Sequence, residues 1–191
     1  MINLSILTGS TRPGRFNIQP ATWMYDIAKK HEGVTAELLD LQDLNLPFLD
    51  EPMPPMMHQY TKDHTKSWSE KIQKADAFIF VTPEYNHSYS AVLKNAIDYL
   101  NHEWNFKPVA FVSYGSLAGG ARAAEHLRGV AGELKMYDLR EQILLPSFYE
   151  HKDDKGNYQF NERHEHAAKA MIEDLKFWGG VMKEARAKMS A

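Results

Sequence analysis

The feature that most limits the possible folds is a nearly unbroken apolar run at residues 77–81, with the sequence AFIFV. A strand that faces solvent on one side alternates apolar and polar residues, whereas a strand covered on both sides is apolar throughout. The run therefore predicts an inner strand of a parallel sheet with helices on both faces. Successive parallel strands need a crossover connection, which is usually a helix.

The rest of the chain shows the required alternation of strands and helices. Short apolar runs predict further strands at 2–8, 34–41, 108–112 and 138–144, and apolar residues with helical spacing predict helices at 18–31, 60–74, 93–100, 127–134 and 168–175. Asn17 is the predicted cap of the first helix, Pro20 fits its first turn, and Gly179 with Gly180 predicts a kink or an end in the last helix.

These elements predict a doubly wound, flavodoxin-like α/β fold. Right-handed crossovers place the helices on both faces of a five-stranded parallel sheet, and the most economical strand order is 2-1-3-4-5. In such a fold the ligand crevice lies outside the carboxyl ends of the strands. The length of 191 residues suits a single domain, 1–191, with its own hydrophobic core.

Charge and composition exclude several classes of function. The 22 Lys and Arg against 25 Asp and Glu give a net charge of −3, which supplies no positive field for nucleic acid or anionic lipid. The chain has no cysteine, so disulfides, thiolate nucleophiles and sulfur-ligated zinc are excluded. No apolar run approaches the roughly 18 residues of a membrane span, and the first residues lack the pattern of a signal peptide. We expect a cytoplasmic protein.

The loop between the first strand and the first helix, residues 9–17, has the composition of an anion site. In a doubly wound fold this loop presents backbone N–H groups and a helix N-terminus to a ligand. Ser10, Thr11 and Asn17 offer hydrogen bonds, and Arg12 and Arg15 offer guanidinium donors suited to phosphate. The loop matches neither a P-loop nor a dinucleotide-binding fingerprint. An ordinary turn with two solvated arginines is the alternative.

Two further segments accompany this loop in the order expected for one crevice. The first is TPEYNHSYSAVLKNAIDYL at 82–100, and the second combines VSYGS at 112–116 with GGAR at 119–122. Over roughly residues 1–145, the three segments together resemble the NADPH-dependent FMN reductase family, whose flavodoxin-like members include azo, quinone and chromate reductases. The resemblance implies an enzyme that passes hydride from NADPH or NADH through bound FMN to a quinone, azo compound, flavin or similar small-molecule acceptor.

The resemblance also implies which residues bind FMN. They are Ser10, Arg12, Arg15, Phe16 and Asn17 at the phosphate, Pro83, Glu84, Tyr85 and Asn86 beside the isoalloxazine, and Ser113, Tyr114 and Gly115 on the pyrimidine side. Arg15 and Tyr85 are also predicted to contact the incoming nicotinamide, and no side chain needs to act as a catalytic acid. The family often has Gly at the position of Ser88 and Pro or Gly near Ser90, which leaves the shape of that loop open.

Several alternatives remain beside this interpretation. A flavodoxin-like electron carrier would also bind FMN, but such carriers are usually far more acidic.

The resemblance implies a homodimer or homotetramer, with residues 90–102 as a candidate contact. The Pro- and Met-rich stretch 43–58 either borders the active site or a partner subunit, or is a plain surface connection. His164 and His166 would point in different directions on a helix, which argues against a shared metal ion.

Overall fold

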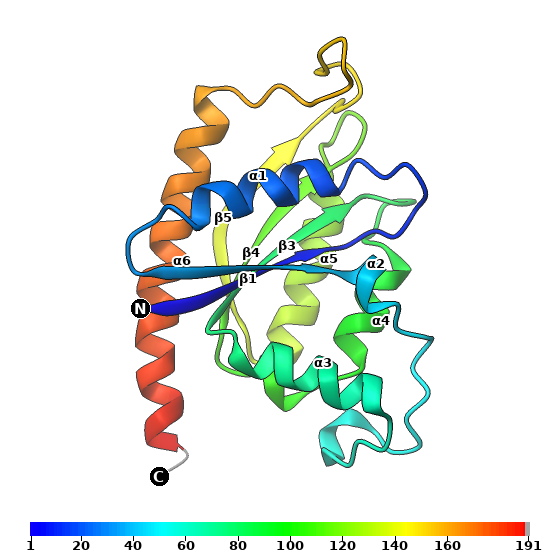
Figure 1. The fold of residues 1–191 in the computed structure, drawn as a ribbon, viewed down its shortest axis with the longest axis vertical. Coiled ribbons are helices and arrows are strands. Elements are labelled where there is room, and N and C mark those ends of the chain that lie inside the picture. Colours follow the sequence, from blue (N-terminus) through cyan, green and yellow to red (C-terminus); the bar gives the residue numbers. More distant parts are fainter. Residues whose placement is uncertain (190–191) are drawn as a thin grey trace.

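A five-stranded parallel sheet forms the centre of the computed structural model, which describes residues 1–189 (Figure 1). The strand order is β2-β1-β3-β4-β5, as predicted. The strands are β1 (Ile2–Thr8), β2 (Val34–Asp40), β3 (Ala77–Pro83), β4 (Pro108–Tyr114) and β5 (Tyr137–Leu145). Every residue of β3 and β4 is buried, which confirms the interpretation of the apolar run as an inner strand.

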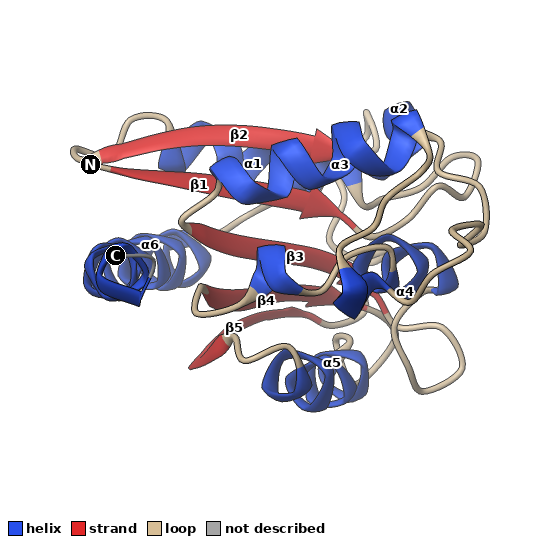
Figure 2. Cartoon of the chain, turned by 90° about the horizontal axis from the view of Figure 1, so that it is seen from below, coloured by secondary structure: helices blue, strands red, loops and turns tan. Residues whose placement is uncertain are grey.

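Helices lie on both sides of the sheet (Figure 2), so the doubly wound arrangement is confirmed. On one face are α1 (Ile18–Ala28) and α6 (Glu162–Met189), and on the other are α3 (Asp63–Lys74), α4 (Ala91–Asp98) and α5 (Ala121–Glu133). Short helices α2 (Leu41–Leu44), η1 (Pro55–Met57) and η2 (His102–Trp104) lie in the connections.

Two hydrophobic cores explain why β3 is apolar at every position. Ala77, Ile79 and Val81 belong to the core under α1 and α6, whereas Phe78 and Phe80 belong to the core under α3, α4 and α5. Because successive strand side chains point to opposite faces, a strand between two cores needs apolar residues throughout. In the described part of the chain, none of the helices is long and apolar enough to cross a membrane.

The helix ends differ most from the sequence predictions. The prediction of an end at Gly179 is wrong, because α6 continues to Met189. A Cβ at Gly179 would lie 3.2 Å from Ile2 Cδ1 and 3.5 Å from Ala77 Cβ, so this glycine lets the helix pack closely on the sheet. Beyond it, Lys183 and Arg186 both bond the carboxylate of Asp76, each at 2.8 Å. Helix α5 begins six residues earlier than predicted, at Ala121.

Candidate functional site

The loop 9–17 leaves β1 at the carboxyl edge of the sheet and crosses the end of β3. The Gly9 amide donates to Val81 O at 2.7 Å, and a Cβ on Gly9 would lie 2.8 Å from that oxygen, so only glycine fits. Ser10 is buried, and its hydroxyl shares a hydrogen bond of 3.0 Å with the phenol of Tyr85. The first and second predicted segments therefore meet, as the strand order requires.

Arg15 is engaged by an acidic residue that the sequence analysis did not consider. Its guanidinium donates to both carboxylate oxygens of Asp40, at 2.7 and 2.6 Å, and to the Ser10 carbonyl at 2.7 Å. Both side chains are only 12–13% exposed. Burial opposes ionisation of Asp40, but hydrogen bonds from Arg15, the Gln42 amide and Thr8 hold its pKa below the ordinary value. Arg15 thus fastens the loop to the end of β2, and Arg12 remains exposed.

Asn17 occupies the cap position of α1, but its side chain does not cap the helix. Its Nδ2 donates to Val81 O at 2.8 Å, and its Oδ1 is buried without a hydrogen-bond partner. The first turn of α1 also contains no acidic residue. The prediction of Asn17 as a helix cap is therefore wrong, and the amide end of α1 is left without a side-chain acceptor.

The other helices that follow strands differ from α1 in this respect. Among the described residues, α2, α4, α5 and α6 each have a side-chain oxygen that accepts a hydrogen bond from a first-turn amide. The acceptor and amide pairs are Asp40 with Gln42 at 2.9 Å, Ser90 with Leu93 at 3.3 Å, Glu84 with Arg122 at 3.2 Å, and Asn161 with His164 at 3.1 Å. In α1 the Gln19 amide donates to Phe16 O at 2.9 Å and Pro20 has no N–H, so the Ile18 amide and the partial positive charge of the helix remain for an external anion. Helix α3 also lacks a side-chain cap, but the acidic Asp63 in its first turn disfavours an anion there.

The turn after β3 is tight and strained. The Tyr85 amide donates to Ser88 O at 2.8 Å, and the Ser88 amide donates to Tyr85 O at 3.1 Å. Between them, Asn86 and His87 have φ of 49° and 71°. This is the pattern of a two-residue type I′ turn, which usually uses Gly. The backbone φ of Ser88 is not in the left-handed region, so this position does not require the glycine that the resemblance had suggested.

The third segment closes the same edge of the sheet. The Ser113 hydroxyl donates to Gly119 O at 3.0 Å, and the Glu84 amide donates to Tyr114 O at 2.9 Å. Gly120 has φ of +86°, and a Cβ there would lie 2.6 Å from Ser113 Cβ, so α5 starts directly against the end of β4. The predicted convergence of the three segments on one edge is confirmed by these contacts.

Buried aromatic rings lie behind this edge. Phe16 stacks on Phe148 with ring centroids 4.5 Å apart and meets the edge of Tyr114 at 5.0 Å. Burial, with the neighbouring Tyr85, raises the pKa of Tyr114 well above its ordinary value, so its phenol stays protonated. Phe16 and Tyr114 therefore support the loops from the core.

An open cleft of about 580 Å³ lies beside the first two segments. Its lining includes three of the predicted FMN-binding residues, Ser10, Arg12 and Tyr85, and Thr11, which the sequence had placed in the anion loop. The seven lining residues that were not predicted to bind a ligand are Leu46, Pro47, Phe48, Ser90, Ala91, Val92 and Asn95. Three residues of the stretch 43–58, Leu46, Pro47 and Phe48, thus border the cleft.

Asn95 fixes this wall of the cleft. Its Nδ2 donates to Pro47 O at 2.7 Å and its Oδ1 accepts from the Leu49 amide at 2.9 Å. Phe48 lies between these two contacts and is 83% exposed. Nothing in the local sequence marks Asn95 as a site residue, because its partners are more than 40 positions away in the chain.

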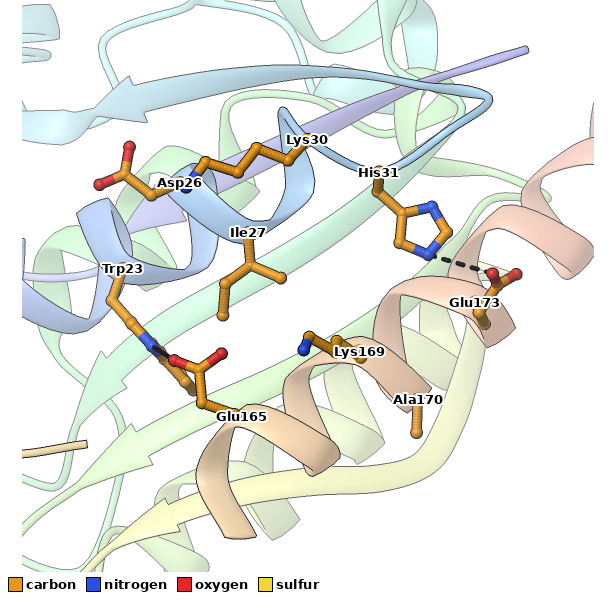
Figure 3. Close-up of a pocket in the computed structure, with 9 residues that line it drawn as sticks. All are labelled: Trp23, Asp26, Ile27, Lys30, His31, Glu165, Lys169, Ala170 and Glu173. Atoms are coloured by element: carbon orange, nitrogen blue, oxygen red, sulfur yellow. Dashed lines mark hydrogen bonds and ion pairs between the residues drawn. The ribbon is translucent and has the colours of Figure 1, made fainter. Parts of the chain in front are cut away.

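A larger hollow of about 710 Å³ lies between α1 and α6 and contains none of the predicted residues (Figure 3). Its carboxylates are occupied, since Glu165 accepts from Trp23 Nε1 at 3.0 Å and Glu173 lies 3.1 Å from His31 Nε2. It lies toward the C-terminal end of α1, away from the loop 9–17. The described residues contain no group of three or more His, Asp or Glu placed to hold a metal ion.

The strand order and the helices on both faces define a flavodoxin-like protein, in which the loop 9–17 and the end of α1 lie at the carboxyl edge of the sheet, where such folds bind ligands. Comparison with known proteins places the chain within that class: residues 2–150 match the sequence model of the NADPH-dependent FMN reductase family. The chain belongs to this family. The predicted family is confirmed, and an electron carrier is not favoured.

Individual relatives agree with this assignment. An NAD(P)H-dependent FMN reductase of Schizosaccharomyces pombe is 47% identical over 133 residues, which cover 69% of this chain and 66% of that protein. An NAD(P)H:quinone oxidoreductase of Solanum tuberosum is 31% identical over 78% of this chain and 77% of its own length. The solved structure of FerB, a flavoenzyme NAD(P)H:(acceptor) oxidoreductase of Paracoccus denitrificans, has a TM-score of 0.74 at 20% identity and covers 95% of this chain and 99% of its own.

Proposed function

We propose that this chain is an FMN-dependent NAD(P)H oxidoreductase that holds the phosphate of FMN on the N-terminus of α1. The observation that carries the proposal is the uncapped end of α1, beside helices whose ends are occupied by side-chain oxygens. Backbone N–H groups and the helix dipole at such an end favour a dianionic phosphate. Family membership supports FMN as the ligand that carries it.

The residues around α1 fit this group. Arg12 is the exposed cation of the loop, because the charge of Arg15 is balanced by Asp40. Ser10 offers a buried hydroxyl. The unpartnered Oδ1 of Asn17 is an acceptor, which suits a ribityl hydroxyl rather than the phosphate. In this proposal Arg12 neutralises the phosphate, and Arg15 holds the loop in shape.

The turn 85–88 is the proposed border of the isoalloxazine. Its internal hydrogen bonds use the amides of Tyr85 and Ser88, so the donors it offers to the ring are those of Asn86 and His87. Backbone donors favour negative charge on the ring without requiring a charged side chain. When bound beside this turn, FMN would supply the hydride-transfer chemistry between NAD(P)H and the acceptor.

The cleft beside the turn is the proposed entry for the nicotinamide and the acceptor. Its walls include Pro47, Phe48 and Val92, which suit a flat ring, and Tyr85, 39% exposed, is the proposed contact. Arg15 is a poorer candidate for this role, since Asp40 engages it. The proposed acceptors are quinones, azo compounds and free flavins. The proposed location is the cytoplasm. The proposed assembly is a homodimer or homotetramer with contacts near residues 90–102.

Spectroscopy and a turnover assay test this function. Purified protein should give the visible spectrum of bound FMN and should oxidise NADPH or NADH with a benzoquinone as acceptor. Absence of flavin binding would reject the central claim, whereas flavin binding without NAD(P)H oxidation would favour an electron carrier.

A pair of arginine variants tests the position of the phosphate. Arg12→Ala should weaken FMN binding by about 1.5–3 kcal/mol, or roughly 10- to 100-fold in Kd, because it removes a charge-assisted contact. Arg140→Ala is the matched control, since Arg140 lies on β5 with a side chain 95% exposed. Equal FMN affinity in the two variants would reject the assignment of Arg12.

A further inference from the structure

We propose that Arg122 is a positioning residue, which acts through the carboxylate of Glu84 to fix the turn 85–88 against α5. This inference rests on the proposed function, in which that turn borders FMN. It assigns to α5 a role in setting where the flavin ring lies, although neither Arg122 nor the Glu84 carboxylate lines the cleft.

The Glu84 side chain is directed to α5. Its Oε2 accepts from the Arg122 amide at 3.2 Å, and its Oε1 pairs with the Arg122 guanidinium. The Glu84 side chain is only 6% exposed, whereas that of Arg122 is 47% exposed. A nearly buried carboxylate needs a partner, and Arg122 supplies both a backbone and a side-chain donor.

A second contact joins the other end of the turn to the same helix. His126 Nδ1 lies 3.0 Å from Ser88 Oγ, and His126 is one helical turn after Arg122. Residues four apart lie on the same face of a helix. One face of α5 therefore holds both the residue before the turn, Glu84, and the residue that ends it, Ser88.

The backbone of the turn explains why it needs support. Asn86 and His87 are consecutive non-glycine residues with positive φ. Residues in this region persist only when their surroundings determine the conformation. Three contacts hold the turn in this conformation: the pair of Arg122 with Glu84, the contact of His126 with Ser88, and the bond from the Glu84 amide to Tyr114 O at 2.9 Å.

The charges of the pair give a test that separates positioning from simple stabilisation. Arg122→Gln leaves an uncompensated negative charge beside the turn, whereas Glu84→Gln leaves an uncompensated positive charge. Negative charge disfavours the reduced, anionic flavin and positive charge favours it. A direct effect of charge alone would therefore lower the midpoint potential of bound FMN in Arg122→Gln and raise it in Glu84→Gln. Loss of positioning is common to both variants, because both break the same contact, and should shift the potential in the same direction in each.

Arg128→Gln is the matched control. Arg128 lies on the same helix, but it bonds Asp138 of β5 at 2.6 Å and does not contact the turn. Arg122→Gln should weaken FMN binding by about ten-fold or more and accelerate hydrogen exchange of residues 85–88 in the FMN-free protein. Arg122→Lys should recover part of both effects, and Arg128→Gln should change FMN affinity by less than about two-fold.

The outcomes distinguish this inference from the function on which it rests. Wild-type protein that binds no FMN would overturn the proposed function and the positioning role with it. Wild-type affinity and exchange in Arg122→Gln, or equal and opposite shifts of potential in Arg122→Gln and Glu84→Gln, would overturn the positioning role alone.

Discussion

Replacement of Gly120 by alanine tests the close junction between β4 and α5. The added Cβ would lie 2.6 Å from Ser113 Cβ and 2.7 Å from the Tyr114 amide nitrogen, and φ at this position is +86°. The left-handed conformation costs a non-glycine residue about 1–2 kcal/mol, and overpacking against fixed backbone costs about 1–3 kcal/mol more. We expect a loss of roughly 2–5 kcal/mol, or about 10 °C in Tm for a chain of this length.

Thermal unfolding of the FMN-free protein, followed by circular dichroism, measures this loss. Gly129→Ala is the control, because Gly129 lies in the same helix and a Cβ there would meet nothing within 4 Å. That change should raise stability by about 0.5–1 kcal/mol. If Gly120→Ala unfolds within about 1 °C of the wild type, the junction is not the rigid contact described above.

Three further predictions concern stability. Asp40→Asn should lower the urea midpoint by the equivalent of about 1–3 kcal/mol, because Arg15 loses its nearly buried partner; an unchanged midpoint would contradict the role of this pair. His87→Gly should raise Tm through a gain of about 1 kcal/mol, since glycine tolerates φ of 71°, and a lower Tm would show that the histidine ring outweighs the strain. Glu51 has a pKa lowered to about 2 against the opposing effect of burial, by hydrogen bonds from Thr61 and Lys62. Its stabilisation should be present above pH 4.5 and lost as the pH falls toward 2, so the stability difference between wild type and Glu51→Gln should shrink over that range; a difference that stays constant would refute the assignment.

The sheet could be predicted because its signals are local. The buried run in β3 and the short apolar runs of the other strands gave each strand to within two residues. The start of α5 was missed because its first residues are three alanines and Arg122, so large apolar residues with helical spacing begin only at Leu127. The helix is set there by Gly119 and Gly120 against the end of β4. The extent of α6 was missed because the close packing of Gly179 is visible only once the sheet is in place.

The meeting of the predicted segments could be inferred from the sequence, but the contacts of each residue could not. Loop position alone brought Ser10 and Tyr85 together, since both follow neighbouring strands. The engagement of Arg15 by Asp40 depends on a residue 25 positions away, and that of Glu84 by Arg122 on one 38 positions away. The resemblance to a family points to Arg15 and Glu84 as site residues. It does not show which distant side chains they bond, because those contacts form only in the folded chain.

The open end of α1 has a thermodynamic consequence. Because α2, α4, α5 and α6 have internal acceptors, the N-termini of these helices need no ligand. Folding of the chain and binding of a ligand are then two equilibria, and they are linked because the ligand binds only the folded chain. A ligand that binds the folded chain alone adds about 2.7 kcal/mol at a hundred-fold excess over its Kd, and this increment grows with the logarithm of its concentration. In the proposed function FMN is that ligand, so the Tm of this chain should rise with the concentration of added FMN.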